Sequence, residues 1–435
     1  MSELLSSDGI AARQVAFHLL NDIYFRRRTL DEAMAQADGF NDLPARDRAF
    51  VRLLVATVLK RTVQLDAMLS TYLHDPISAL KPATLVNIFR LGMAQFMFLK
   101  TAAHAAVNTT VTLAEAEGIA HHKPLVNAIM RRLVREPPAD IDDRDAGKIN
   151  TPAWLWQTWM QDYGVETALD IAAANLGEGA LDITVKNNPE AWAEKLDATL
   201  LPTGSLRKYA SGFIPDLPGF ADGEWWVQNA VAALPALLFG DLNGKTVIDL
   251  CAAPGGKTAQ LAAAGATVTA LDRSAVRLMR LRENMERLHF DVETVTADGA
   301  SWLPSAPVDA VLLDAPCTAT GTIRHQPDLL HLKDPKDQDK LAALQRRLIK
   351  QAALMLKPGG TLVYCTCSLQ KAEGEDQMDW LNAEGLGLKP APIAAHEING
   401  IDSLLNDRGE IRALPSHWAN IGGCDGFFIA RYSKV

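Results

Sequence analysis

Short β-rich runs alternate with helical patterns through the second half of the chain, and no other feature constrains the fold as strongly. The alternation begins near residue 240, where helical patterns such as Ser274–Arg287 and Lys336–Leu356 separate most of the runs. It predicts a mainly parallel, doubly wound α/β sheet. The expected strands are Thr246–Leu250, Thr267–Leu271, Val292–Thr296, Asp309–Leu313, Thr361–Cys365 and a late one, Gly426–Tyr432, that could close an edge of the sheet.

The first part of the chain follows a different pattern. From Ala12 to about Arg135 apolar residues recur with helical periods, which predicts an all-α domain. A polar linker that contains prolines, residues 136–145, ends this stretch. The residues after it show both helical and strand patterns. We therefore predict a helical domain at 1–136, a small α/β connector at 145–222 and a catalytic α/β domain at 223–435.

The distribution of charge favours a nucleic-acid ligand for the helical domain. The net charge of the whole chain is −9, yet residues 1–135 carry an excess of four positive charges. Basic clusters lie at Arg26–Arg28, Lys60–Arg61 and Arg131–Arg135. Such a block can dock on a phosphate backbone although the protein is acidic overall, but ordinary surface charge would look similar.

The cysteines and the hydropathy pattern indicate a cytoplasmic protein. The five cysteines all lie in the second half of the chain, and none forms a CxxC pair. An odd number without paired spacing argues against a disulfide framework or a zinc ribbon. The chain also has no apolar run of 18 residues and no signal-peptide pattern at its start, so we expect no membrane segment.

A glycine-containing turn after the first strand of the α/β region predicts a cofactor site. The segment Asp249–Thr258 reads DLCAAPGGKT, and glycines at such a turn allow a ligand to approach the backbone closely. Asp272 and Asp298 follow the next two strands, where they can meet ribose hydroxyls and an adenine edge. A P-loop needs glycine where Cys251 stands, and the dinucleotide fingerprint G-x-G-x-x-G is absent.

Two further motifs end the fourth and fifth strands. Leu312-Leu-Asp314-Ala-Pro-Cys317 ends the fourth strand, and Tyr364-Cys-Thr-Cys367-Ser ends the fifth. Adjacent strand ends would place Cys317 and Cys367 across one pocket. These motifs resemble those of the RNA cytosine-5 methyltransferases of the NOL/NOP2/Sun group. The resemblance covers nearly the whole chain, including a NusB-like helical block at His104–Asn108 and Val126–Ala128 and a closing motif at Gly422–Phe428.

The resemblance implies a fold, a cofactor and a substrate. The catalytic domain would be a Rossmann-like class I domain that binds S-adenosyl-L-methionine without a metal. The RNA partner would be 16S rRNA, free or partly assembled, and we expect the protein to act as a monomer. In this family pattern, the cofactor-binding residues are Cys251, Ala252, Ala253, Pro254, Gly255, Gly256, Lys257, Asp272, Asp298 and Asp314.

The same pattern assigns catalytic roles. Cys367 would be the nucleophile that adds to carbon 6 of a cytosine, and Cys317 would assist release of the enzyme from the product. Asp314 would hydrogen-bond the ring and favour protonation at N3. Thr318-Ala-Thr320 departs from the serine-glycine usual after the Asp-Ala-Pro-Cys motif, which bears on fine substrate contacts.

Three other functions remain open at this point. A tRNA cytosine-5 methyltransferase would use identical chemistry, although the NusB-like block favours the ribosomal substrate. A DNA cytosine methyltransferase would use the cysteine of its Pro-Cys motif, here Cys317, as the nucleophile. A non-enzymatic RNA-binding assembly factor would need neither cysteine.

Overall fold

The computed structural model describes residues 8–209 and 213–435, which form two compact units. The first unit takes the described residues up to Glu178 together with Ile323–Lys333, and the second takes those in Gly179–Thr322 and Asp334–Val435. The predicted connector at 145–222 thus contributes to both units, and its standing as a separate domain stays a prediction. Within the described ranges, no helix has both the length and the apolar character needed to cross a membrane.

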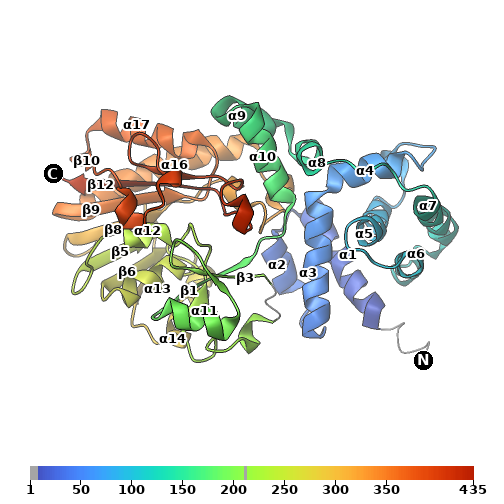
Figure 1. Cartoon of the computed structure of the whole chain (residues 1–435), viewed down its shortest axis with the longest axis horizontal. Coiled ribbons are helices and arrows are strands. Elements are labelled where there is room, and N and C mark those ends of the chain that lie inside the picture. The colour runs from blue at the N-terminus through green and yellow to red at the C-terminus, as the bar shows by residue number, and fades with distance from the viewer. Residues whose placement is uncertain (1–7, 210–212) are drawn as a thin grey trace. The chain divides into compact units, whose positions relative to one another are not determined.

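The first unit is helical, as the sequence pattern predicts (Figure 1). Apolar residues at helical spacing face its core, for example Val126, Ile129 and Leu133 of one helix, while Arg131 and Arg132 of that helix are exposed. The helices longer than three residues are α1 (Asp8–Arg26), α2 (Leu30–Gln36), α3 (Ala45–Lys60), α4 (Thr62–Ser70), α5 (Leu85–Met97), α6 (Ala103–Ala116), α7 (Lys123–Arg135), α8 (Asp143–Asn150), α9 (Ala153–Tyr163), α10 (Val165–Leu176) and α15 (Leu329–Leu332).

The segment Ile323–Lys333 belongs to this helical unit although it lies within the α/β part of the sequence. The His331 ring packs edge-on against Tyr24 with ring centroids 5.1 Å apart, and its Nε2 hydrogen-bonds the carbonyl oxygen of Leu59 at 2.8 Å. Arg27 donates to the carbonyl oxygen of Leu332 at 2.7 Å. These contacts hold the segment on α1 and α3.

A small antiparallel sheet opens the second unit. Its strands run in the order β2-β3-β1-β4, which agrees with the strand patterns expected in the connector. The Arg207 guanidinium on β3 forms a fully buried ion pair with Asp182 at 2.7 Å. The elements are β1 (Leu181–Val185), α11 (Pro189–Leu196), β2 (Thr199–Leu200), β3 (Leu206–Lys208) and β4 (Trp225–Val227).

The main sheet has the order β10-β12-β9-β8-β5-β6-β7, with β11 paired to β12. The five strands from β9 to β7 are parallel, which confirms the predicted doubly wound sheet. The late strand forms, but it does not lie at the edge: β12 pairs with β9 on one side and with β10 on the other. The strands are β5 (Thr246–Leu250), β6 (Thr267–Asp272), β7 (Glu293–Thr296), β8 (Val308–Asp314), β9 (Leu356–Thr366), β10 (Leu388–Pro390), β11 (Ile411–Ala413) and β12 (Phe427–Lys434).

Helices cover both faces of this sheet because successive strand residues point to opposite sides (Figure 1). Val311 and Leu313 pack in one core with α16 and α17, whereas Leu312 and Val363 pack in another with α12 and α13. The carboxyl ends of the parallel strands therefore meet at one edge, where the predicted site residues lie. The helices are α12 (Leu234–Leu237), α13 (Gly256–Ala263), α14 (Ala275–Arg287), α16 (Pro335–Met355) and α17 (Glu375–Glu384).

Candidate active site

The two cysteines expected to share a pocket lie side by side. Strand β8 ends at Asp314 and its parallel neighbour β9 ends at Thr366, so Cys317 and Cys367 follow adjacent strand ends. Their Sγ atoms are 3.5 Å apart, and both residues are partly exposed. Backbone hydrogen bonds join the two loops, including one from the Gly321 N–H to the Cys367 carbonyl oxygen at 2.9 Å. The two thiols thus form the cluster that adjacent strand ends predict.

Asp314 lies in the same cluster, where a lysine and a third cysteine contact it. Lys257 Nζ donates to Asp314 Oδ2 at 2.7 Å, and the Cys365 thiol lies 3.6 Å from Oδ1. Burial disfavours the lysine charge, but the Asp314 carboxylate outweighs this effect and raises the pKa of Lys257. The sequence predicts Lys257 to be a cofactor residue, and the structure directs its ammonium to Asp314.

Three cysteines near the site have raised pKa values. A hydrogen bond with Cys367, together with burial and the nearby Glu373 carboxylate, raises the pKa of the Cys317 thiol well above its ordinary value. Burial likewise raises the pKa of Cys365 and of Cys251. Cys317 therefore carries its proton at neutral pH.

The glycine turn forms as predicted, between β5 and α13. Gly255 has a φ of +103°, and a Cβ there would lie 2.9 Å from Leu281 Cγ, so the position requires glycine. Helix α13 begins at Gly256, directly after the turn. The first N–H groups of α13 have no acceptor within the helix, so they can donate to a ligand at the carboxyl edge of the sheet.

Two buried carboxylates beside this turn have oxygens available to a ligand. Asp272 is 2% exposed, and no described residue donates a hydrogen bond to its Oδ2, although Arg277 lies 3.2 Å away. Asp249 Oδ1 is buried with no hydrogen-bond donor among the described residues either, while Oδ2 accepts from Thr258 at 2.6 Å. Burial raises the pKa of Asp249 to about 7. These acceptors fit the hydroxyl and amino groups of S-adenosylmethionine.

Asp298, which the sequence places near the adenine, is exposed, whereas Asp249 and Asp272 are buried. It follows β7, its side chain is 60% exposed, and its Oδ1 accepts from the Ala300 N–H at 3.0 Å. The Arg347 guanidinium lies 3.8 Å from its Oδ2. An exposed carboxylate of this kind is free to reorient toward a ligand, and its assignment to the adenine stays a prediction.

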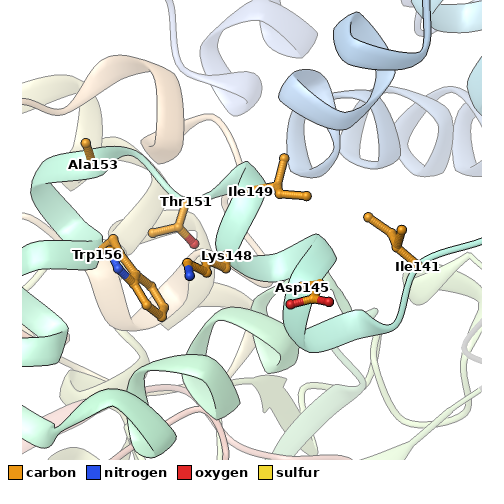
Figure 2. Close-up of a pocket in the computed structure, with 7 residues that line it drawn as sticks. All are labelled: Ile141, Asp145, Lys148, Ile149, Thr151, Ala153 and Trp156. Atoms are coloured by element: carbon orange, nitrogen blue, oxygen red, sulfur yellow. The ribbon is translucent and has the colours of Figure 1, made fainter.

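A separate hollow of about 490 Å³ lies in the helical unit (Figure 2). Lys148 lies over the Trp156 ring, with Nζ 5.3 Å from the ring centroid. None of the predicted site residues lines this hollow. Its lining residues are Ile141, Asp145, Lys148, Ile149, Thr151, Ala153 and Trp156.

The three basic clusters of the helical unit are not equivalent. Asp22 forms ion pairs with both Arg26 and Arg28, and Lys60 is 5% exposed, with Nζ donating to the Gly177 carbonyl oxygen. The arginines near the end of α7 are exposed, and the ion pair recorded among them joins Arg132 to Glu136. The surface at the end of α7 therefore presents positive charge to solvent.

Sequence reasoning missed one group at the site, Glu373. It lies six residues after Cys367 and is fully buried, and its carboxylate contacts the residues that follow both cysteines. The available signal was a glutamate at the start of a helix shortly after the cysteine motif, which reads equally well as a helix cap.

Comparison with known proteins agrees with the fold. Residues 236–433 match the family described as 16S rRNA methyltransferase RsmB/F, and residues 10–135 match the NusB family. The solved structure named PH0851 has the same fold over 98% of each chain, with a TM-score of 0.77 and 22% identity. NSun6 from Pyrococcus horikoshii, solved with SFG, aligns with a TM-score of 0.55 and 20% identity over 65% of this chain and 98% of its own.

The protein is therefore an S-adenosylmethionine-dependent RNA methyltransferase with a Rossmann-like catalytic domain. Ribosomal RNA small subunit methyltransferase B of Xanthomonas campestris is 35% identical to it over the whole length of both chains. The chain belongs to the ribosomal RNA small subunit methyltransferase B family.

Proposed function

We propose that the protein transfers a methyl group from S-adenosylmethionine to carbon 5 of a cytosine in 16S rRNA, with Cys367 as the nucleophile. The observation that carries this proposal is the 3.5 Å approach of Cys317 and Cys367 beside Asp314. A methyl transfer to a heteroatom would not need two thiols at this place. Carbon 5 is a poor nucleophile, and a thiolate that adds to carbon 6 makes it reactive.

In the first step the Cys367 thiolate forms a bond to carbon 6, and the displaced π electrons move toward N3. N3 takes up a proton, which the hydrogen-bonded pair of Lys257 and Asp314 can supply and later take back. Bound S-adenosylmethionine supplies an electrophilic methyl group on a cationic sulfur. Carbon 5 of the activated ring then forms the new carbon–carbon bond.

Release requires the reverse of the addition. Carbon 5 loses its proton to water, the bond between Cys367 and carbon 6 breaks, and the ring double bond returns. The Cys317 thiol lies within 3.5 Å of the departing sulfur and carries a proton at neutral pH, so its S–H can hydrogen-bond to the Cys367 thiolate as that sulfur leaves carbon 6. This arrangement agrees with the role in release that the family resemblance assigns to Cys317.

Substrate access and docking involve other parts of the chain. The target base must be unpaired or flipped out before its ring can reach the thiols. The helical unit, with its exposed arginines on α7, supplies a surface that suits a phosphate backbone. Because a folded subunit can bury the base, free or partly assembled rRNA is the proposed substrate.

The test is methylation in vitro followed by bisulfite sequencing, with free 16S rRNA, intact small subunits and bulk tRNA as parallel substrates. The proposal predicts one protected cytosine in free rRNA, less in intact subunits and none in tRNA. Modification of tRNA alone would show that the protein is a tRNA cytosine-5 methyltransferase. Equal methylation of free rRNA and intact subunits would contradict the proposed substrate state.

A further inference from the structure

One buried carboxylate contacts the loops of both cysteines. Glu373 ends a short 3₁₀ helix, Lys371–Glu373, and has no exposed surface. Its Oε1 accepts from the Thr318 N–H at 3.0 Å, and its Oε2 accepts from the hydroxyl groups of Thr318 at 2.5 Å and Ser368 at 2.6 Å. Thr318 follows Cys317 directly, and Ser368 follows Cys367.

The position of this carboxylate is itself fixed from several sides. Gln345 on α16 donates to Glu373 Oε1 at 3.1 Å and to the Pro316 carbonyl oxygen at 2.9 Å. The carbonyl oxygen of Glu373 accepts from the Tyr364 hydroxyl at 2.8 Å. A carboxylate held in this way can fix the positions of the loops that it binds relative to the sheet and to α16.

We propose that Glu373 is a positioning residue for the reaction, because its hydrogen bonds to Thr318 and Ser368 set the separation of the Cys317 and Cys367 sulfur atoms. The inference rests on the proposed function for its catalytic meaning, but the positioning itself concerns only the two thiols. It also gives a reason for Thr318, which departs from the usual serine and still provides a hydroxyl group for the carboxylate.

A purely structural role makes a different prediction. A buried carboxylate with several donors stabilises the fold, and its loss lowers the free energy of unfolding wherever it lies. That loss alone changes neither the probability that the two thiols meet nor the rate of one chemical step. The separation of the sulfurs must therefore be measured directly, apart from stability.

The experiment compares the Glu373→Gln variant with wild type and with Glu397→Gln. Glutamine keeps the size of the side chain but places an amide N–H₂ group where donors surround it. At least one hydrogen bond to the loops of the two cysteines is therefore lost. Glu397 is a matched control because its carboxylate is also hydrogen-bonded, to Arg431 at 2.5 Å and to the Ala394 N–H at 2.9 Å. Thermal unfolding and calorimetry with S-adenosylmethionine establish that each variant is folded and binds the cofactor.

The first measurement needs no RNA. Each protein is equilibrated with reduced and oxidised glutathione, and mass spectrometry quantifies the Cys317–Cys367 disulfide, which forms as oxidised glutathione is reduced to two thiols. The ratio of the two proteins' equilibrium constants gives the change in effective concentration of one thiol at the other. We expect Glu373→Gln to lower it about 10- to 100-fold and Glu397→Gln to leave it within about twofold. An unchanged value in Glu373→Gln overturns the proposal.

The second measurement is the release rate of the covalent RNA adduct. We expect release to slow about tenfold or more in Glu373→Gln, with the KM for RNA unchanged. If wild type forms no adduct, the proposed function fails while the disulfide measurement still decides the positioning role. If Glu373→Gln does not fold, Thr318→Val and Ser368→Ala each remove one hydroxyl donor from the carboxylate. Wild-type disulfide equilibria in both of these variants would then overturn the proposal.

Discussion

Replacement of Lys257 by methionine tests whether this side chain serves the reaction or the cofactor. The change keeps the aliphatic stem and removes the ammonium that donates to Asp314 at 2.7 Å. The Lys257 side chain is 10% exposed and that of Asp314 is 32% exposed, so water can replace only part of the lost interaction. Breaking a fully buried pair costs about 3–5 kcal/mol, and with this exposure we expect about 1–3 kcal/mol of unfolding free energy.

The catalytic effect should be larger than the loss of stability. Without the ammonium, Asp314 loses its nearest proton source, and we expect single-turnover methylation to fall about 10²- to 10⁴-fold. S-adenosylmethionine binding, measured by calorimetry, should weaken by about threefold at most, or about 0.7 kcal/mol, because the ammonium faces Asp314. Lys357→Met is the matched control, since Lys357 pairs with Asp309 at 3.0 Å and is 46% exposed. A loss of rate that only follows weaker cofactor binding would refute the catalytic assignment.

Three more predictions concern release, pH and RNA binding. Cys317→Ala should let the RNA adduct accumulate on denaturing gels, and rapid wild-type release would exclude its role. Folding raises the pKa of Asp249 to about 7. This carboxyl therefore makes the wild type lose up to about 4 kcal/mol of unfolding free energy as the pH rises from about 4 to 7. Urea unfolding should show a flatter dependence of this free energy on pH for Asp249→Asn. Replacing both Arg131 and Arg135 by alanine should reduce the slope of log K for RNA against log salt by about one to two. Arg144→Ala, whose guanidinium already pairs with Glu166 and Asp170, should leave the slope unchanged.

The fold was predictable where local pattern decides it. Strand β5 begins and ends at the predicted residues, and Ser274 caps α14 as its sequence position suggests. Strand β10 was missed because Leu388–Pro390 is short and contains a proline, so β12 was wrongly expected at an edge. The place of Ile323–Lys333 in the helical unit was equally invisible, since contacts such as His331 with Leu59 join residues far apart in sequence.

The candidate site also has features that the sequence predicts and features that it does not. The approach of Cys317 to Cys367 follows from strand order, because parallel neighbours bring their carboxyl ends together. The direction of the Lys257 side chain and the contacts of Glu373 depend on rotamers and on hydrogen bonds across the sheet, which no spacing in the sequence encodes. The sequence motifs therefore predict the reacting cysteines but not the side-chain contacts that position them.

The most direct measurement is the site of covalent attachment to RNA. An rRNA fragment with 5-fluorocytosine at the target position should trap the enzyme, because the fluorine on carbon 5 cannot leave as a proton does. After nuclease digestion, mass spectrometry should find the modified nucleotide on Cys367 in wild type, and Cys367→Ala should form no adduct. Attachment to Cys317 instead, or methylation by Cys367→Ala at the wild-type rate, would contradict nucleophilic attack by Cys367.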